Sequence, residues 1–362
     1  MGARKIKTKR AMIVIPILVI LAAFATVSAA TFQGSDAADI SAHFLAGSRE
    51  NKEQLRALFA FLDAPENSPE TNFAIAREIA HNYFRNGEYG RLIHFLGGRT
   101  VMFPDDPFNS YYLLMIAYAH MRRGSTPIAA RYFNLIVKNH PDLEVNGTSI
   151  HLTCLLQLIE MNDNPELQMW YYHELLSRFP DDIDRGIIWF RLAQIYESLG
   201  LWNDSIRAYA TFLTQANRVV PGFPNAEAHA RRIVAFSNSP RNWTFATLPE
   251  LTAAVRGALE TNNGARLRGM QAGVNFFTRS WGQGDIQSSQ PFNIQNFLWG
   301  VRIRVADRFH ERSNESEVFL RTWGWQQAVP VWYFHFRQIH FPADPAVHGR
   351  WEWAGIYYGE SL

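Results

Sequence analysis

Proline returns at a nearly constant interval through the middle of this 362-residue chain. Pro104, Pro141 and Pro180 are 37 and 39 residues apart, and an aspartate follows each of them. From about residue 71 to residue 216 the apolar residues recur with the period of an α-helix. Because proline cannot continue a helix, the spacing predicts that one helix ends just before each proline.

Glycines mark the same interval. Gly87 and Gly124 are 37 residues apart, and Gly200 follows 76 residues later, about two intervals further on. The intervening position is occupied by the segment Asn162 to Pro165, which also interrupts a helical pattern. A glycine in mid-interval and a proline near its end predict two helices per interval, joined by a turn.

This pattern resembles the tetratricopeptide repeat (TPR), whose period lies in the thirties. The clearest repeat begins at Gly186, the next at Ser110, and weaker ones begin at Phe73 and Ser149. In the clearest repeat the family's aromatic, Leu, small, Tyr, Gly, small and aromatic positions are Trp189, Leu192, Ala193, Tyr196, Gly200, Ser205 and Tyr209. The resemblance implies a mostly α chain with a right-handed α-solenoid of about four helix pairs over residues 71–216. Stacking of at least three repeats would bury a continuous core.

The segments on either side of the predicted solenoid are also expected to contain helix. Residues 31–70 form a helical lead-in, with a helix at about 37–62. Residues 217–247 are interpreted as a capping helix and a linker. Within them, Asn225 to Ser237 alternates alanine with polar residues, and Asn225 is the predicted N-cap.

Composition changes at residue 248, because eight of the eleven tryptophans lie between Trp243 and Trp353. Two short helices are predicted in 248–271 and a strand in 273–281. In 331–337 aromatic residues alternate with polar ones, which predicts a strand with one buried face. The alternation shifts again at Gly355, which indicates a bend. Residues 248–362 are therefore expected to form a smaller aromatic-rich α+β domain with a curved antiparallel sheet.

The N-terminus bears on the compartment. Five basic residues lie in the first ten positions, and residues 11–30 that follow are uncharged and end in small residues. This is typical of a signal peptide, and twenty apolar residues are also long enough for an uncleaved membrane anchor. Both alternatives predict an extracytoplasmic location, either periplasmic or anchored at the outer face of the inner membrane. Without residues 1–30 the chain has 30 basic and 33 acidic residues, a net charge of −3, which does not suit nucleic acid.

The resemblance also implies a binding groove, lined by exposed positions on the first helix of each repeat. These positions carry over to Arg77, His81, Arg85, Tyr111, Tyr118, Arg122, Gln157 and Gln194. The first three recur at every fourth residue, so they share one helical face and are predicted to bind the carboxylates of an acidic or C-terminal peptide. The alternative is that they form the solvated side of an amphipathic helix.

The residues that could carry chemistry do not match a catalytic or metal-binding pattern. The single cysteine, Cys154, lies in an apolar run and is interpreted as a buried hydrophobe. His335, His340, His348 and Asp344 have no metal-ligand spacing, so the histidines are interpreted as surface residues. Trp351, Glu352 and Trp353 could form a sugar-binding platform, but core packing of the tryptophans is favoured. No catalytic residues, metal site or cofactor are therefore predicted.

These observations favour a non-enzymatic scaffold or assembly factor of the bacterial cell envelope, whose TPR groove binds another envelope protein or peptide segment. In the alternative, residues 248–362 bind a small ligand or the glycan of peptidoglycan, with hydrolysis as a variant, and the helices recruit them. Membrane contact is expected only through residues 11–30, if they are not cleaved.

Overall fold

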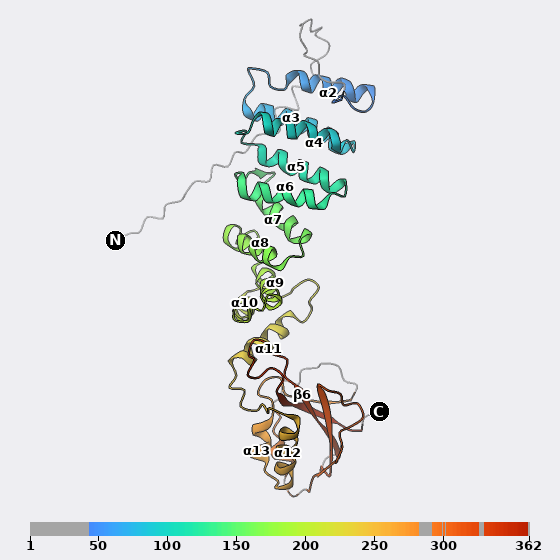
Figure 1. Ribbon diagram of the computed structural model, residues 1–362, viewed down its shortest axis with the longest axis vertical. Coiled ribbons are helices and arrows are strands. Elements are labelled where there is room, and N and C mark those ends of the chain that lie inside the picture. Colours follow the sequence, from blue (N-terminus) through green and yellow to red (C-terminus); the bar gives the residue numbers. More distant parts are fainter. Residues whose placement is uncertain (1–42, 282–291, 299, 301, 326–328, 361–362) are drawn as a thin grey trace, which may run out of the picture. The chain divides into compact units, whose positions relative to one another are not determined.

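The computed structural model describes residues 43–281, 292–298, 300, 302–325 and 329–360. The chain divides into two compact units, Met1–Asp106 and Pro107–Leu362, which we call the first and the second unit. The described part is mostly helical and ends in a small sheet (Figure 1). No helix in these ranges is both long and apolar enough to cross a bilayer. The predicted signal or anchor, residues 11–30, lies outside them.

In the first unit the described helices are α2 (Arg49–Phe61), α3 (Pro69–Arg85) and α4 (Tyr89–Met102). Helix α2 lies within the predicted lead-in helix of about 37–62 but begins later than predicted, because residues 43–48 form turns and bends. Residues 37–42 fall outside the described ranges. Helices α2 and α3 begin in the same way, because the hydroxyls of Ser48 and Ser68 accept hydrogen bonds from backbone N–H groups three residues later. Helix α3 packs against both α2 and α4.

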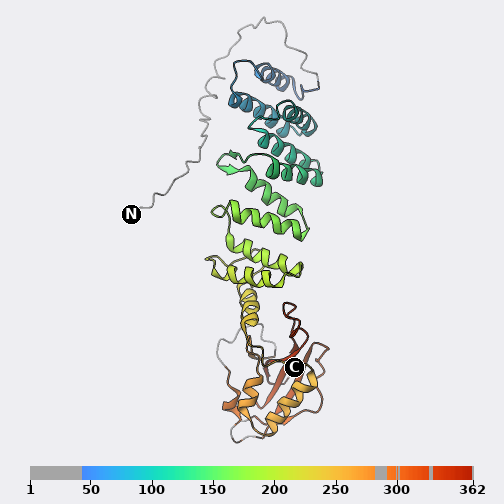
Figure 2. The same cartoon turned by 60° about the vertical axis from the view of Figure 1, so that its left-hand side comes forward.

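In the second unit seven described helices precede the C-terminal region. They are α5 (Asn109–Arg122), α6 (Thr126–Asn139), α7 (Ile150–Met161), α8 (Pro165–Arg178), α9 (Arg185–Ser198), α10 (Trp202–Thr214) and α11 (Ala226–Asn238). A hairpin of β1 (Glu144–Val145) and β2 (Thr148–Ser149) precedes α7. Each of these helices packs on the next in chain order (Figure 2). The predicted capping helix is α11, but the side chain of Asn225 makes no capping hydrogen bond there.

The recurring glycines build the same turn three times. Gly87, Gly124 and Gly200 all adopt positive φ, at 72°, 74° and 71°. After each glycine, the next backbone N–H bonds to a carbonyl five residues back, as Glu88 does to Tyr83 and as Ser125 and Leu201 do in the other two turns. This is a helix C-terminal motif that favours glycine, because a side chain is strained at this φ. The spacing of the glycines is thus the spacing of one turn geometry.

The prolines end the second helix of each pair, as predicted. Pro104, Pro141 and Pro180 stand two residues beyond the ends of α4, α6 and α8. Between α7 and α8, where no glycine occurs, the Asn164 side chain accepts a hydrogen bond from the Leu167 N–H, and Pro165 begins α8. The local backbone chemistry of these residues therefore explains both the recurring turns and the helix ends.

In the C-terminal region, 248–362, the described residues form two helices, a 3₁₀ turn and a five-stranded sheet. Its elements are α12 (Leu248–Glu260), α13 (Gly264–Met270), β3 (Phe277–Ser280), η1 (Ile294–Phe297), β4 (Arg304–Val305), β5 (Glu317–Trp323), β6 (Val331–Gln338) and β7 (Trp351–Tyr358). The strand order is β3-β7-β6-β5-β4. Strand β3 runs parallel to β7, so the prediction of a wholly antiparallel sheet is wrong for this edge.

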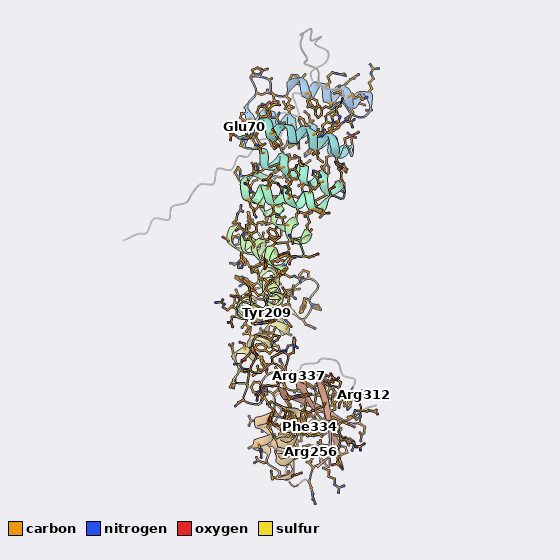
Figure 3. The ribbon with its side chains drawn as sticks, viewed as in Figure 1. Glu70, Tyr209, Arg256, Arg312, Phe334 and Arg337 are labelled. Carbon is orange, nitrogen blue, oxygen red and sulfur yellow. The ribbon has the colours of Figure 1, made fainter. Side chains whose placement is uncertain are left out.

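One face of this sheet packs on α12 and α13. Trp332, Phe334 and Phe336 of β6 are buried there, in one cluster with Leu251 and Val255 of α12. Phe334 lies at the centre of the sheet, and its ring stacks on Trp353 at 4.4 Å between centroids (Figure 3). Aromatic side chains fill the space between helices and sheet.

The opposite face is also buried, which corrects the prediction that β6 has one buried face. Tyr333 and His335 are only 2% and 5% exposed. The ring of Phe319 from β5 stacks on His335 at 4.8 Å, and Trp281 stacks on Tyr357 at 4.4 Å. These partners come from β5, from β7 and from the residue after β3, so alternation within β6 alone could not show them. The interpretation of His335 as a surface histidine is therefore wrong.

Gly355 of β7 leaves room on that second face for an aromatic ring from the neighbouring strand β3. The pairing of β6 with β7 shifts register between His335 and Phe336, opposite Gly355, where a bend was predicted. The ring of Phe277 lies over Gly355, and a β-carbon there would come within 2.7 Å of it. Only glycine leaves room for this ring.

The predicted linker is packed against α11 and the segment after β6, within the second unit. Trp243 is buried in one cluster with Phe236 of α11 and with Phe341 from the segment after β6, and the tilted rings of Phe236 and Phe341 lie 4.7 Å apart. The Trp243 Nε1–H donates to Glu352 Oε2 at 3.1 Å, and Arg337 Nε donates to Glu352 Oε1 at 2.8 Å. Glu352 is therefore a buried structural carboxylate, and core packing of Trp351 and Trp353 is confirmed.

Candidate functional site

The first unit carries three of the predicted groove residues on α3. Arg77, His81 and Arg85 recur at every fourth residue of one helix, which places them along one side. Arg77 lies over the ring of Phe73, with its guanidinium carbon 5.6 Å from the ring centroid. All three are at least partly exposed. The row is therefore continuous along α3.

The row carries less positive charge than its sequence suggests. The Arg85 guanidinium donates to Glu78 Oε1 at 3.1 Å, so an acid about two turns away offsets one of the two arginines. Burial lowers the pKa of His81, and the positive charges of Arg77 and Arg85 lower it further against the pull of Glu78. Near neutral pH the row thus contains two guanidiniums, a neutral imidazole and one carboxylate.

In the second unit the predicted residues divide into buried and accessible ones. Tyr111 is 5% exposed, so the expectation of an exposed groove position is wrong there, because α5 is buried along most of its length. Tyr118 packs edge-on against Phe133 of α6 at 5.8 Å, and burial raises the pKa of its hydroxyl. Arg122, one turn further on α5, is exposed.

The two glutamines occupy α7 and α9. Gln157 is partly exposed, and the Gln194 Oε1 accepts a hydrogen bond from Arg191 at 3.1 Å. Arg191 is absent from the predicted set, although it lies three residues before Gln194. Its second bond, to the Pro221 carbonyl at 2.8 Å, links α9 to the segment after α10. Helices α5, α7 and α9 thus present a mixture of amide, phenol and guanidinium groups.

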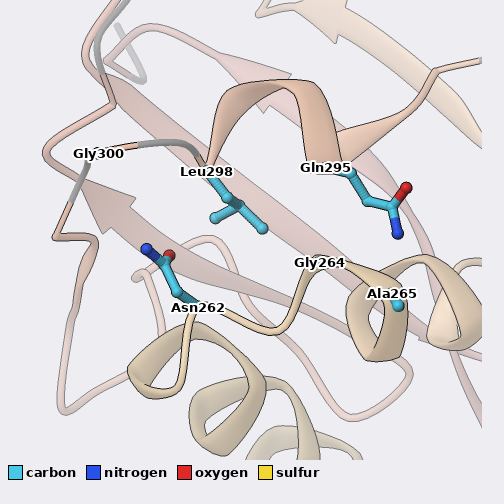
Figure 4. A pocket seen from close by; sticks show the side chains of 6 residues that line it. All are labelled: Asn262, Gly264, Ala265, Gln295, Leu298 and Gly300. Carbon is cyan, nitrogen blue, oxygen red and sulfur yellow. The ribbon is translucent and has the colours of Figure 1, made fainter.

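A hollow in the C-terminal region bears on the alternative of a small-ligand binder. It has a volume of about 400 Å³ and lies between the turn before α13 and η1 (Figure 4). Its lining consists of Asn262, Gly264, Ala265, Gln295, Leu298 and Gly300. None of these residues is charged or titratable, so the described part of the lining offers neither a general acid nor a general base.

The groups considered for chemistry are engaged in packing. Cys154 is fully buried, and burial raises the pKa of its thiol, which confirms the hydrophobic interpretation. His335 sits 3.8 Å from Glu317, but burial, with Arg337 and Arg279 nearby, lowers the pKa of its ring to about 3. A neutral imidazole at this distance forms no ion pair, so we regard His335 as a packed ring. Within the described ranges no three metal-ligating side chains converge.

The sequence prediction did not include two kinds of residue that contact the predicted ones: neighbours on the same helix, and partners from distant elements. Glu78 could have been found from its position on α3, seven residues before Arg85. The partners of Glu352, by contrast, lie 109 and 15 residues away, and no local signal connects them. A scan against models of protein families found no match to this chain, and a search of curated proteins found none either.

Proposed function

We propose that this chain is a non-enzymatic scaffold of the bacterial cell envelope, in which α3 to α10 act as TPR-like helix pairs that bind a partner protein. The proposal is carried by one observation: the turn inside a helix pair is built with the same φ and the same hydrogen bonds at Gly87, Gly124 and Gly200. Repeated pairs of this kind present many similar surfaces in a row, which suits protein binding.

The export part of the proposal rests on the N-terminal sequence. Five basic residues before an uncharged apolar segment, residues 11–30, support passage into or across the inner membrane. The remaining chain would then face the periplasm, where it meets other envelope proteins. No cofactor is part of the proposal.

Each unit contributes a proposed binding surface of its own: the side of α3 that carries Arg77 and Arg85 in the first unit, and the side of α5 that carries Arg122 in the second. Because Glu78 offsets part of the charge on α3, a partner would be held by several weak polar contacts more than by one carboxylate clamp. Aromatic packing closes the space between α12, α13 and the sheet, and the hollow beside η1 is uncharged. Both features argue for a docking role of the C-terminal region over hydrolysis.

The test uses a photo-crosslinking amino acid in living cells. We expect crosslinks from positions 85 and 122 to one and the same envelope protein. Matched controls at Arg131 of α6 and Arg207 of α10, which are exposed on second helices, should give none. Charge reversal of Arg77 and Arg85 together should weaken capture while thermal unfolding stays nearly unchanged.

Two results would count against the scaffold proposal. Crosslinks that are equally frequent at all four positions would mean that the first helices have no special role. Absence of protein crosslinks, together with co-sedimentation of the protein with purified cell-wall sacculi, would favour the glycan-binding alternative.

A further inference from the structure

A further charged surface lies within the second unit and involves none of the predicted groove residues. It begins with the segment Gln215–Asn225, which connects α10 to α11. This segment is held firmly on α9, because Arg191 donates to the Pro221 carbonyl at 2.8 Å and the Asn217 side chain donates to Asp184. The Asn217 carbonyl lies so close to Gly186 that a β-carbon there would be 2.2 Å away.

The same segment turns apolar side chains both inward and outward. Val220 is buried, and the ring of Phe223 lies 5.0 Å from that of Phe190 in α9. Val219 is 76% exposed although its neighbour is buried. The inward contacts therefore hold the backbone in place while Arg218 and Val219 remain on the outer side. A surface fixed in this way loses little conformational entropy when a ligand binds.

An open cleft of about 740 Å³ lies between this segment and α11. Its charged lining consists of Arg218, Glu227, Arg231 and Arg232. Three asparagines add amide groups, two from the segment and one, Asn275, from the C-terminal region. We call this hollow the α11 cleft. It contains three guanidiniums and one carboxylate.

The carboxylate orients two of the guanidiniums. Glu227 Oε1 accepts from Arg218 at 2.7 Å and from Arg231 at 2.5 Å, and these bonds hold the pKa of Glu227 below its usual range. Arg232 contacts the Nδ1 of His229 at 3.3 Å, and burial lowers the pKa of that histidine, so it adds no charge near neutral pH. The cleft keeps a surplus of two positive charges. Each guanidinium has five N–H donors, more than these contacts use.

The lining favours an extended acidic peptide over a single small anion. The lining from Asn225, which precedes α11, to Ala235 spans about 15 Å at 1.5 Å per residue. That length matches about four or five residues of an extended strand at 3.3 Å each. Arginine forks bind carboxylates, asparagine amides pair with peptide groups, and exposed Val219 and Pro224 offer apolar contacts at the rim.

We propose that the α11 cleft binds an acidic, extended segment of a partner protein. The inference rests on the proposed role in protein binding, but it uses a different surface from the row of Arg77, His81 and Arg85 on α3. The overall composition fits this choice, since the chain beyond residue 30 has more acidic than basic residues and lacks the charge for nucleic acid.

The test is a selection of random twelve-residue peptides, displayed on phage, against the full-length protein in detergent. We expect the selected peptides to carry two or more Asp or Glu residues within five positions. Synthetic copies should bind the R231E/R232E variant at least tenfold more weakly. The control variant R207E/R266E makes the same charge change on exposed arginines elsewhere and should bind as the wild type does. If the glutamate variant unfolds early, R231Q/R232Q replaces it.

Several outcomes would overturn the inference. They are selected peptides without an acidic excess, failure to select any peptide, and equal binding to the R231E/R232E variant. Loss of binding in R77E/R85E alone would support the row on α3 and reject the α11 cleft. Competition by inorganic phosphate at the same concentration as the peptide would mean that the cleft recognises a free anion.

Discussion

The helices and the C-terminal sheet bury aromatic side chains by different routes. Phe133 of α6 is buried among helices close to it in sequence, and its ring meets Tyr118 of the preceding helix. Phe334 of β6 is equally buried, but its cluster includes α12, some eighty residues earlier, and β7. The helices therefore depend on neighbours along the chain, whereas the sheet depends on contacts distant in sequence. A local defect should accordingly stay local in one region and spread in the other.

The largest effect is expected from removing one of these rings. Phe334→Ala and Phe133→Ala should each cost about 3–5 kcal/mol in the region that they destabilise, because each leaves a cavity in a packed core. Hydrogen exchange should show lost protection throughout β5, β6, β7 and α12 for Phe334→Ala. For Phe133→Ala the loss should be confined to α5, α6 and α7. Equal loss in α9 to α11 would contradict the comparison.

Acid should affect the sheet through His335. Its pKa of about 3 in the folded protein lies below its ordinary value of 6.5, because the buried ring resists charging. The unfolded chain therefore takes up the proton first. Stability is fully present above pH 6.5 and falls as the pH drops from 6.5 towards 3, by up to about 1.4 kcal/mol per pH unit.

Replacing His335 by Phe tests this linkage, because phenylalanine keeps a ring against Phe277 and Phe319 but cannot take up a proton. Urea unfolding at pH 7 and pH 4.5, followed by tryptophan fluorescence, should give a smaller loss of stability for the variant. The same loss in both proteins would show that His335 does not sense acid.

Glycine substitutions sharpen the comparison at smaller magnitude. Gly124→Ala should destabilise the helices by about 1 kcal/mol, because alanine is strained at a φ of 74°. Gly98→Ala in the interior of α4 meets open space and should stabilise the first unit by up to about 1 kcal/mol. Gly355→Ala should cost about 1–3 kcal/mol because of Phe277, although its φ is ordinary. Thermal unfolding measures all three, and a neutral Gly355→Ala would mean that the ring moves aside.

The predicted binding residues show the same difference between local and distant contacts. Helical spacing placed Arg77, His81 and Arg85 on one side of α3, because a helix fixes which residues share a face. It gave no warning that Tyr111 is buried, since burial depends on what packs against α5. The α11 cleft escaped prediction because its lining comes from a connecting segment, from α11 and from Asn275.

The sequence alone determined where the helices end and where their turns lie. Proline and glycine restrict or free the backbone only at adjacent residues, so Gly87, Gly124 and Gly200 predict their turns from the sequence alone. Only the tertiary structure decided that both faces of β6 are buried, that Glu352 joins Trp243 to Arg337, and that the predicted linker is packed against α11 and the segment after β6. Those features depend on which distant strand or helix lies alongside, and no periodicity within one segment carries that information.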